Sequence, residues 1–328
     1  MNADILKRLV RAIAEGSQDD LNSLAKKVIE SERESGHSKL AGELDRIFDR
    51  ARARPANHAV PDLRELPSSR RHREMLVTLH PRETLEHCMV LPPDVDERFA
   101  RVEREYAARE RLSAYGLRPR KRVLLHGPPG CGKSLGAKRL AWNTTLPLMK
   151  VRFDALLSSY FGESAANLRM VFEAAKERPC VLLLDECDFI ARSRSGSRDI
   201  GEASRVVNAL LQFLDEYDAP GTLVATTNVE ESLDEAIFRR FDDVFLIPLP
   251  GEAEIDRLLK LTLSAIKVSG QVDWEAVITA LTGSSAAYVV KAAQDAAKAT
   301  VLAGRKTVEE SDLQQAIREI RKGNSSPP

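Results

Sequence analysis

The feature of this chain that most constrains its fold is a glycine-rich run, Gly-Pro-Pro-Gly-Cys-Gly-Lys-Ser, at residues 127–134. It follows directly on the apolar stretch Val123–Leu125, which predicts a buried strand. Two glycines separated by four residues and followed by lysine and serine have the spacing of a loop that holds phosphate groups between a strand and a helix. The glycines let backbone N–H groups turn toward phosphate oxygens, and the following helix adds its positive end. We therefore expect a nucleotide-binding α/β domain.

The residue types in this loop predict what each position binds. The ammonium group of Lys133 would lie at the β- and γ-phosphates, and the hydroxyl group of Ser134 would bind Mg²⁺. We expect ATP and Mg²⁺ to be the nucleotide and the metal ion of this site. The predicted nucleotide-binding residues are Gly127, Pro128, Pro129, Gly130, Cys131, Gly132, Lys133, Ser134 and Leu135.

Two further apolar runs end in polar residues. Val181–Leu184 is followed by Asp185 and Glu186, and a run beginning at Leu223 is followed by Asn228. Ligands of open α/β sheets bind at the carboxyl ends of the strands. We therefore expect Asp185 to hold the metal ion, mainly through water, and Glu186 to activate the attacking water molecule. Asn228 would hold that water in line, although asparagine after a strand is also a common turn residue.

Short apolar stretches and helical stretches alternate as far as residue 250. The expected strands are Arg122–Leu125, Leu148–Arg152, Val181–Leu184, Leu223–Thr226 and Val244–Ile247. Strands separated by helices indicate a parallel sheet covered on both faces. After Pro250 the pattern predicts helices only, at 252–266, 273–281, 285–302 and 309–322. The expected fold is a P-loop NTPase with a parallel sheet over residues 92–250, an all-helical unit over 251–322 and a frayed tail at 323–328.

The residues before this domain have a different character. Residues 1–50 show helical spacing of apolar residues and predict a small helical N-terminal module. Residues 51–91 read as a basic linker with one short strand, Met75–Leu79, and seven arginines lie between residues 50 and 73. The sequence has no aromatic residues interleaved with these arginines, which favours a solvated tether over a nucleic-acid surface. A charged helix is expected at 94–115, with Val95, Phe99, Val102 and Tyr106 on its inner face.

Composition and the distribution of apolar residues and cysteines argue against a membrane-spanning protein, a secreted protein and a cysteine-based metal site. The chain has 328 residues, with 49 Lys and Arg against 49 Asp and Glu, so its formal net charge is zero and gives no hint of nucleic-acid binding. No apolar run is long enough to span a membrane, and the N-terminus does not resemble a secretory signal. The four cysteines form no metal-type pairs. We expect a cytoplasmic enzyme without a membrane partner.

The motifs in combination resemble those of the AAA+ ATPases, in the AAA branch defined by a second region of homology. They are GPPGCGKS (the Walker A motif), VLLLDE (Walker B), LVATTN and LDEAIFRRFD, and the likeness extends from about residue 92 to 322. The resemblance implies that Asn228 is the sensor-1 residue and that Arg239 and Arg240 lie in the arginine-finger region. It implies a ring, normally a hexamer, in which these arginines reach the nucleotide of the neighbouring subunit. The helices after Pro250 would be the lid over the nucleotide, and no sensor-2 arginine is evident there.

A further resemblance lies in Tyr160, Phe161 and Gly162. Members that thread proteins carry an aromatic–hydrophobic–glycine tripeptide in a central pore loop, where it grips an extended polypeptide. The polar residues on either side favour an exposed loop over a core position. Residues 192–200 lie where the family has a second pore loop, but their Ser, Gly and Arg content fits a flexible surface loop equally well.

Three functions follow from these patterns. The first is a ring-shaped ATPase, a chaperone-type machine, that remodels or unfolds a protein substrate through its pore. The second is a nucleic-acid-stimulated ATPase, for which the basic linker is the direct support. The third is a nucleotide-gated regulator of a partner enzyme such as a protease. The short helical module on a single AAA domain is similar to small bacterial ATPases encoded beside a subtilisin-like serine protease.

Overall fold

The computed structural model of the protein describes residue 42 and residues 66–69, 74–157, 163–187, 200–228 and 238–324. The chain divides into two compact units, residues 1–63 and 64–328. The fold and the sites described below belong to the second unit. The helical module expected over residues 1–50 lies outside the described residues, apart from residue 42, which is helical, and so do residues 51–65 and 70–73 of the basic linker.

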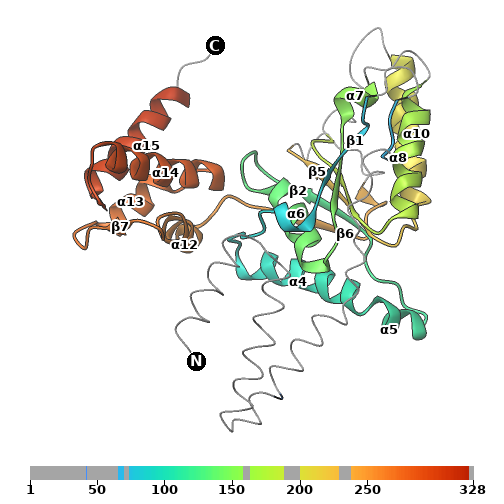
Figure 1. Cartoon of the computed structure of the whole chain (residues 1–328), viewed down its shortest axis with the longest axis horizontal. Coiled ribbons are helices and arrows are strands. Elements are labelled where there is room, and N and C mark those ends of the chain that lie inside the picture. Colours follow the sequence, from blue (N-terminus) through green and yellow to red (C-terminus); the bar gives the residue numbers. More distant parts are fainter. Residues whose placement is uncertain are drawn as a thin grey trace. The chain divides into compact units, whose positions relative to one another are not determined.

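The second unit contains a six-stranded sheet in the order β1-β3-β4-β5-β2-β6 (Figure 1). Its strands are β1 (Val77–His80), β2 (Arg122–His126), β3 (Leu148–Val151), β4 (Val181–Leu184), β5 (Thr222–Thr227) and β6 (Asp243–Leu246). Strands β2 to β6 are mutually parallel and match the five expected strands closely. Strand β1, from the region read as linker, pairs antiparallel with β3 and forms one edge of the sheet.

Each face of the sheet packs against its own helices because successive side chains of a strand point to opposite faces. Leu182 and Leu184 of β4 belong to the core that contains α8 (Ser164–Glu177) and α10 (Ile200–Asp215). Val181 and Leu183 belong to the opposite core. That second core contains α4 (Pro93–Ala107) and α6 (Lys133–Thr144). Both faces are therefore buried, as a continuous apolar strand requires.

The charged helix expected at 94–115 is present as two helices, α4 and α5 (Arg109–Ala114). The predicted inner face of α4 is confirmed, because Val95, Phe99, Val102 and Tyr106 are all buried. The remaining short elements of this unit are η2 (Arg82–Thr84) and α7 (Phe153–Leu157).

The residues after Pro250 form the predicted helices around a core of their own. These are α12 (Glu252–Thr262), α13 (Trp274–Leu281), α14 (Ala286–Leu302) and α15 (Glu310–Asn324) (Figure 1). The expectation of an all-helical unit was wrong in one respect, because β7 (Lys267–Val268) and β8 (Thr307–Val308) pair in parallel between these helices. Two-residue strands are too short to leave a period-2 pattern in the sequence. In the described part of the chain, no helix is both long and apolar enough to cross a bilayer.

Candidate nucleotide site

The glycine-rich loop connects β2 to α6, as its spacing predicts. Gly127 has φ +138°, and a Cβ atom there would lie 2.2 Å from the carbonyl oxygen of Ile247, so only glycine fits. Gly132, the N-cap of α6, has φ +94°. Lys133 is buried, and its Nζ donates hydrogen bonds of 2.8 Å to the carbonyl oxygens of Gly127 and Pro128. The loop therefore folds around an ammonium group that is already inside it.

Asp185 receives hydrogen bonds from three elements. The hydroxyl of Ser134 on α6 donates to its Oδ1 over 2.8 Å, and that of Thr226 on β5 donates to the same oxygen over 2.7 Å. Lys150 on β3 pairs with its Oδ2 over 2.6 Å. Burial alone would raise the pKa of Asp185, but the hydrogen bonds from Lys150, Thr226 and Ser134 outweigh burial and lower that pKa below its ordinary value. Asp185 is therefore a fixed carboxylate at the carboxyl end of β4.

The residues around Asp185 fit a magnesium ion. A carboxylate and a hydroxyl group are the hard oxygen ligands that Mg²⁺ prefers, and the ammonium group of Lys150 already places a cation beside this carboxylate. In the part of the chain that the structure describes, His, Cys, Asp and Glu do not gather in threes around any point that could hold a metal ion. A cation beside Asp185 would therefore take its other ligands from water and substrate, which is how Mg²⁺ usually binds in phosphate-processing sites.

The turn after β4 holds Glu186 in an unusual conformation. Its φ of +57° is rare for a residue with a side chain and costs about 1 kcal/mol or more. The turn is fixed from β5, since the N–H of Glu186 donates to Thr226 Oγ1 and the N–H of Cys187 to the Thr226 carbonyl, each over 2.8 Å. The Glu186 side chain is exposed and makes no hydrogen bond or ion pair within the described residues. A free carboxylate thus stands next to the fixed one.

A largely apolar pocket of about 540 Å³ adjoins the loop. Its wall combines residues 85–90, the glycine-rich loop and helices α12 and α14. Helix α14 also contacts the loop directly, because the N–H of Ala287 donates to the carbonyl oxygen of Gly130 over 2.9 Å. The pocket has the size and lining of a site for the flat ring of a small ligand. A base could lie there while phosphates occupy the loop.

Comparison with known proteins bears on this site. The model of the family "ATPase family associated with various cellular activities (AAA)" matches residues 123–249. The chain is 34% identical over 318 residues to "Uncharacterized AAA family ATPase y4kL" of Sinorhizobium fredii, covering 96% of this chain and 94% of that protein. The chain belongs to the AAA family of ATPases. This AAA ATPase is also 35% identical over 212 residues to "26S proteasome regulatory subunit S10B homolog B" of Arabidopsis thaliana, covering 62% of this chain and 53% of that protein.

In this AAA ATPase, the residues predicted to bind or hydrolyse the nucleotide lie in two separate places. The glycine-rich loop, Ser134, Asp185, Glu186 and Asn228 all lie at the carboxyl edge of the sheet. The other two, Arg239 and Arg240, come just before β6 and lie at the opposite edge, where Arg240 Nε contacts Asp215 Oδ2 over 3.0 Å. Tyr160, Phe161 and Gly162 lie outside the described residues, as does most of 192–200.

Sequence reasoning missed Lys150, Thr226 and the segment 85–90. A lysine within the apolar strand Leu148–Val151 was a usable signal, because a charge in a buried strand normally has a partner. Thr226 was read as a strand residue, and its side chain gives no sign of its role until β4 and β5 are paired. Residues 85–90 have no periodic pattern, so nothing in the sequence marks them as a pocket wall.

Proposed function

We propose that this AAA ATPase works as a ring in which each nucleotide site is completed by arginines of the neighbouring subunit. The observation that carries the proposal is the position of Arg239 and Arg240. Strand β6 begins at Asp243, which pairs with Val123 near the start of β2, whereas the glycine-rich loop follows the end of β2. At about 3.3 Å per residue, the length of β2 separates the two arginines from the glycine-rich loop of their own subunit by roughly 15 Å. These arginines therefore suit a second subunit's nucleotide better than their own.

In the proposed reaction, the residues at the carboxyl edge bind the phosphates and the metal ion and activate the attacking water. Lys133 and the backbone N–H groups of the loop would bind the β- and γ-phosphates, and Ser134 and Asp185 would hold Mg²⁺, which neutralises phosphate charge when bound. Glu186 would accept a proton from the attacking water, and its free carboxylate is suited to that task. Asn228 would orient the water by a hydrogen bond.

The decisive experiment mixes two inactive variants. Glu186→Gln removes the proton acceptor from a subunit's own nucleotide site. The double variant Arg239→Ala/Arg240→Ala removes the cations that a subunit contributes to the site of its neighbour. If the arginines act between subunits, mixed rings regain ATP hydrolysis. In a randomly mixed ring, about a quarter of the interfaces join a subunit that keeps Glu186 to a neighbour that keeps both arginines. Arg101→Ala, an exposed arginine on α4, is the matched control and should keep full activity.

Two results would contradict the shared site. One is a double variant that hydrolyses ATP at the wild-type rate. The other is a mixture that stays as inactive as its components although an affinity tag on one variant co-purifies the other, which shows that mixed rings form. Failure of the wild-type protein to bind adenine nucleotides would remove the proposal altogether.

We further propose that hydrolysis drives remodelling of a protein substrate, with a hexamer as the assembly. The support is the tripeptide Tyr160–Gly162 together with the similarity to a proteasome regulatory subunit. The variant Tyr160→Ala should keep its basal ATP hydrolysis but lose stimulation by an unfolded protein such as casein. Stimulation that is unchanged in this variant would exclude threading by this loop, and stimulation by DNA or RNA instead would favour the nucleic-acid alternative.

A further inference from the structure

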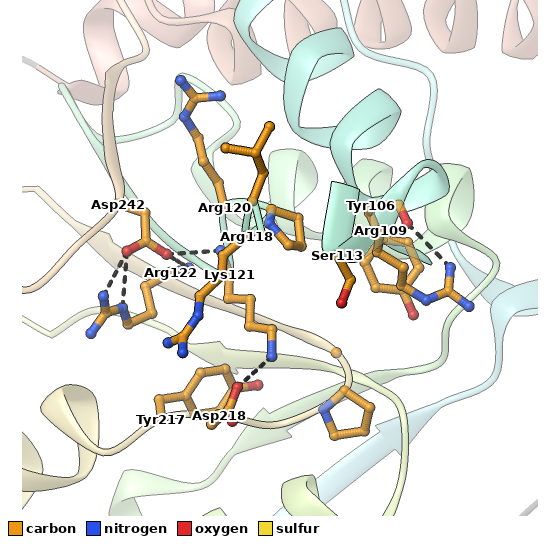
Figure 2. A pocket seen from close by; sticks show the side chains of 14 residues that line it. Tyr106, Arg109, Ser113, Arg118, Arg120, Lys121, Arg122, Tyr217, Asp218 and Asp242 are labelled. Atoms are coloured by element: carbon orange, nitrogen blue, oxygen red, sulfur yellow. Dashed lines mark hydrogen bonds and ion pairs between the residues drawn. The ribbon is translucent and has the colours of Figure 1, made fainter. Parts of the chain in front are cut away.

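A second pocket, of about 580 Å³, lies at the amino edge of the sheet (Figure 2). Its wall includes Arg122 at the start of β2 and Gly221 just before β5, so it lies at the end of these strands opposite to the glycine-rich loop. Residues of α4, α5 and the segment 117–121 complete it. No residue assigned to the nucleotide site lines this pocket.

The pocket is rich in positive charge. Its cations are Arg109, Arg118, Arg120, Lys121 and Arg122, and its carboxylates are Asp218 and Asp242 (Figure 2). Lys121 pairs with Asp218 over 2.7 Å, and Arg122 pairs with Asp242 over 2.6 Å. Arg120 pairs with Glu105 and Asp243, which do not line the pocket. Three of the five cations are therefore already compensated.

The remaining two cations, Arg109 and Arg118, have only weak, solvent-screened partners. Within the described residues, Arg118 is exposed and makes no hydrogen bond or ion pair. Its charge adds to that of Lys121 in lowering the pKa of Asp218, but the Asp218 side chain is 81% exposed, so water screens this attraction. The Arg109 guanidinium lies 4.7 Å from the centre of the Tyr106 ring and donates to the Tyr106 carbonyl over 3.1 Å. Its approach to Glu110 is 3.9 Å, and the Glu110 side chain is 92% exposed, so water screens that contact. Two positive charges thus stay available to an occupant.

The pocket also offers apolar surface. Leu117, which lines the pocket, is 57% exposed. Tyr217 also lines the pocket, with only 6% of its surface exposed.

We propose that this pocket binds a peptide segment of a partner protein in which one or two carboxylates flank an apolar side chain. The carboxylates pair with Arg109 and Arg118, and the apolar side chain covers Leu117. A nucleic-acid strand suits the pocket less well, because Asp218 and Asp242 lie in its wall and would repel closely spaced phosphates.

The test uses the full-length protein and an array of peptides of about twelve residues, a length that fills an extended recognition groove. Each peptide carries two acidic and two apolar residues at varied positions among glycine and serine, and a parallel set carries lysine in place of the acids. The variants are Arg118→Glu and, as matched control, Arg111→Glu, an exposed arginine of α5 that does not line the pocket. An oligothymidylate of similar length tests the nucleic-acid outcome.

We expect acidic–apolar peptides to bind the wild type and the control, and Arg118→Glu to weaken that binding by about tenfold or more, since reversal of one charge converts attraction into repulsion. The milder variant Arg118→Gln should weaken it less. ATP hydrolysis should be unchanged in all three variants, which also verifies that they fold. The proposal is overturned if no peptide binds in a way that depends on Arg118, or if the oligothymidylate binds with that dependence and the peptides do not.

Discussion

Replacing Lys150 by methionine is expected to strengthen metal binding at Asp185. The ammonium group of Lys150 lies 2.6 Å from Asp185 Oδ2 and would have to leave it, or share it, when a cation binds. The Lys150 side chain is 44% exposed and that of Asp185 10% exposed, so the pair lies between a surface and a buried ion pair. Such a pair is worth about 1 kcal/mol, and removing this competition would raise the affinity for Mg²⁺ by about fivefold.

The same change should weaken the metal-free fold. Asp185 keeps its hydrogen bonds from Ser134 and Thr226, so the carboxylate is not left without partners. The expected loss in the free energy of unfolding is therefore only about 1 kcal/mol, measured by urea denaturation in EDTA. Methionine keeps the length of the apolar stem, which limits the loss of packing.

Metal affinity is measured by titrating Mg²⁺ against binding of a fluorescent ATP analogue, and independently by the free Mn²⁺ signal in electron paramagnetic resonance. Lys138→Met is the matched control, because Lys138 is a lysine of α6 that is 35% exposed and lies 3.9 Å from its partner Glu86. The control should change neither quantity. The reasoning is wrong if Lys150→Met binds Mg²⁺ as weakly as the wild type, or more weakly.

Two further predictions concern stability. Hydrogen bonds from Arg305 and other groups lower the pKa of Asp312 to about 2, so its contribution to stability is complete above its unfolded pKa of roughly 4 and is lost as the pH falls toward 2. Asp312→Asn should lower the free energy of unfolding by about 1 kcal/mol at pH 7, measured by urea denaturation. This is less than the full pKa shift of Asp312 implies, because the side chain of its partner Arg305 is 38% exposed and water screens the pair. If the stability difference between the variant and the wild type were as large at pH 2 as at pH 7, this account would be wrong. Gly130→Ala would place a Cβ atom 2.8 Å from the hydroxyl of Ser285, the N-cap of α14, whereas Gly304→Ala meets nothing within 4 Å at a similar φ. We expect Gly130→Ala to lose about 1 kcal/mol more than this control through the displaced cap, and equal losses would show that the loop and α14 are not in contact.

The sheet was predictable because its signals are local. Each of the strands β2 to β6 contains an apolar run, and the helical patterns between these runs predicted a parallel arrangement. The glycine-rich loop was predictable for the same reason, since its strand, glycines, lysine and serine are contiguous. Strand β1 could be recognised as a strand, but its place at the sheet edge could not, because pairing with β3 is a long-range event.

The local sequence therefore determined which side chains carry charge, hydroxyl groups or special backbone freedom, and at which strand ends they stand. Only the tertiary structure decided which of them meet. Lys150, Ser134, Asp185 and Thr226 come from four different elements, and the order of the strands brings them together. The same order separates Arg239 and Arg240 from the loop by the length of β2, because parallel strands put their beginnings and their ends at opposite edges.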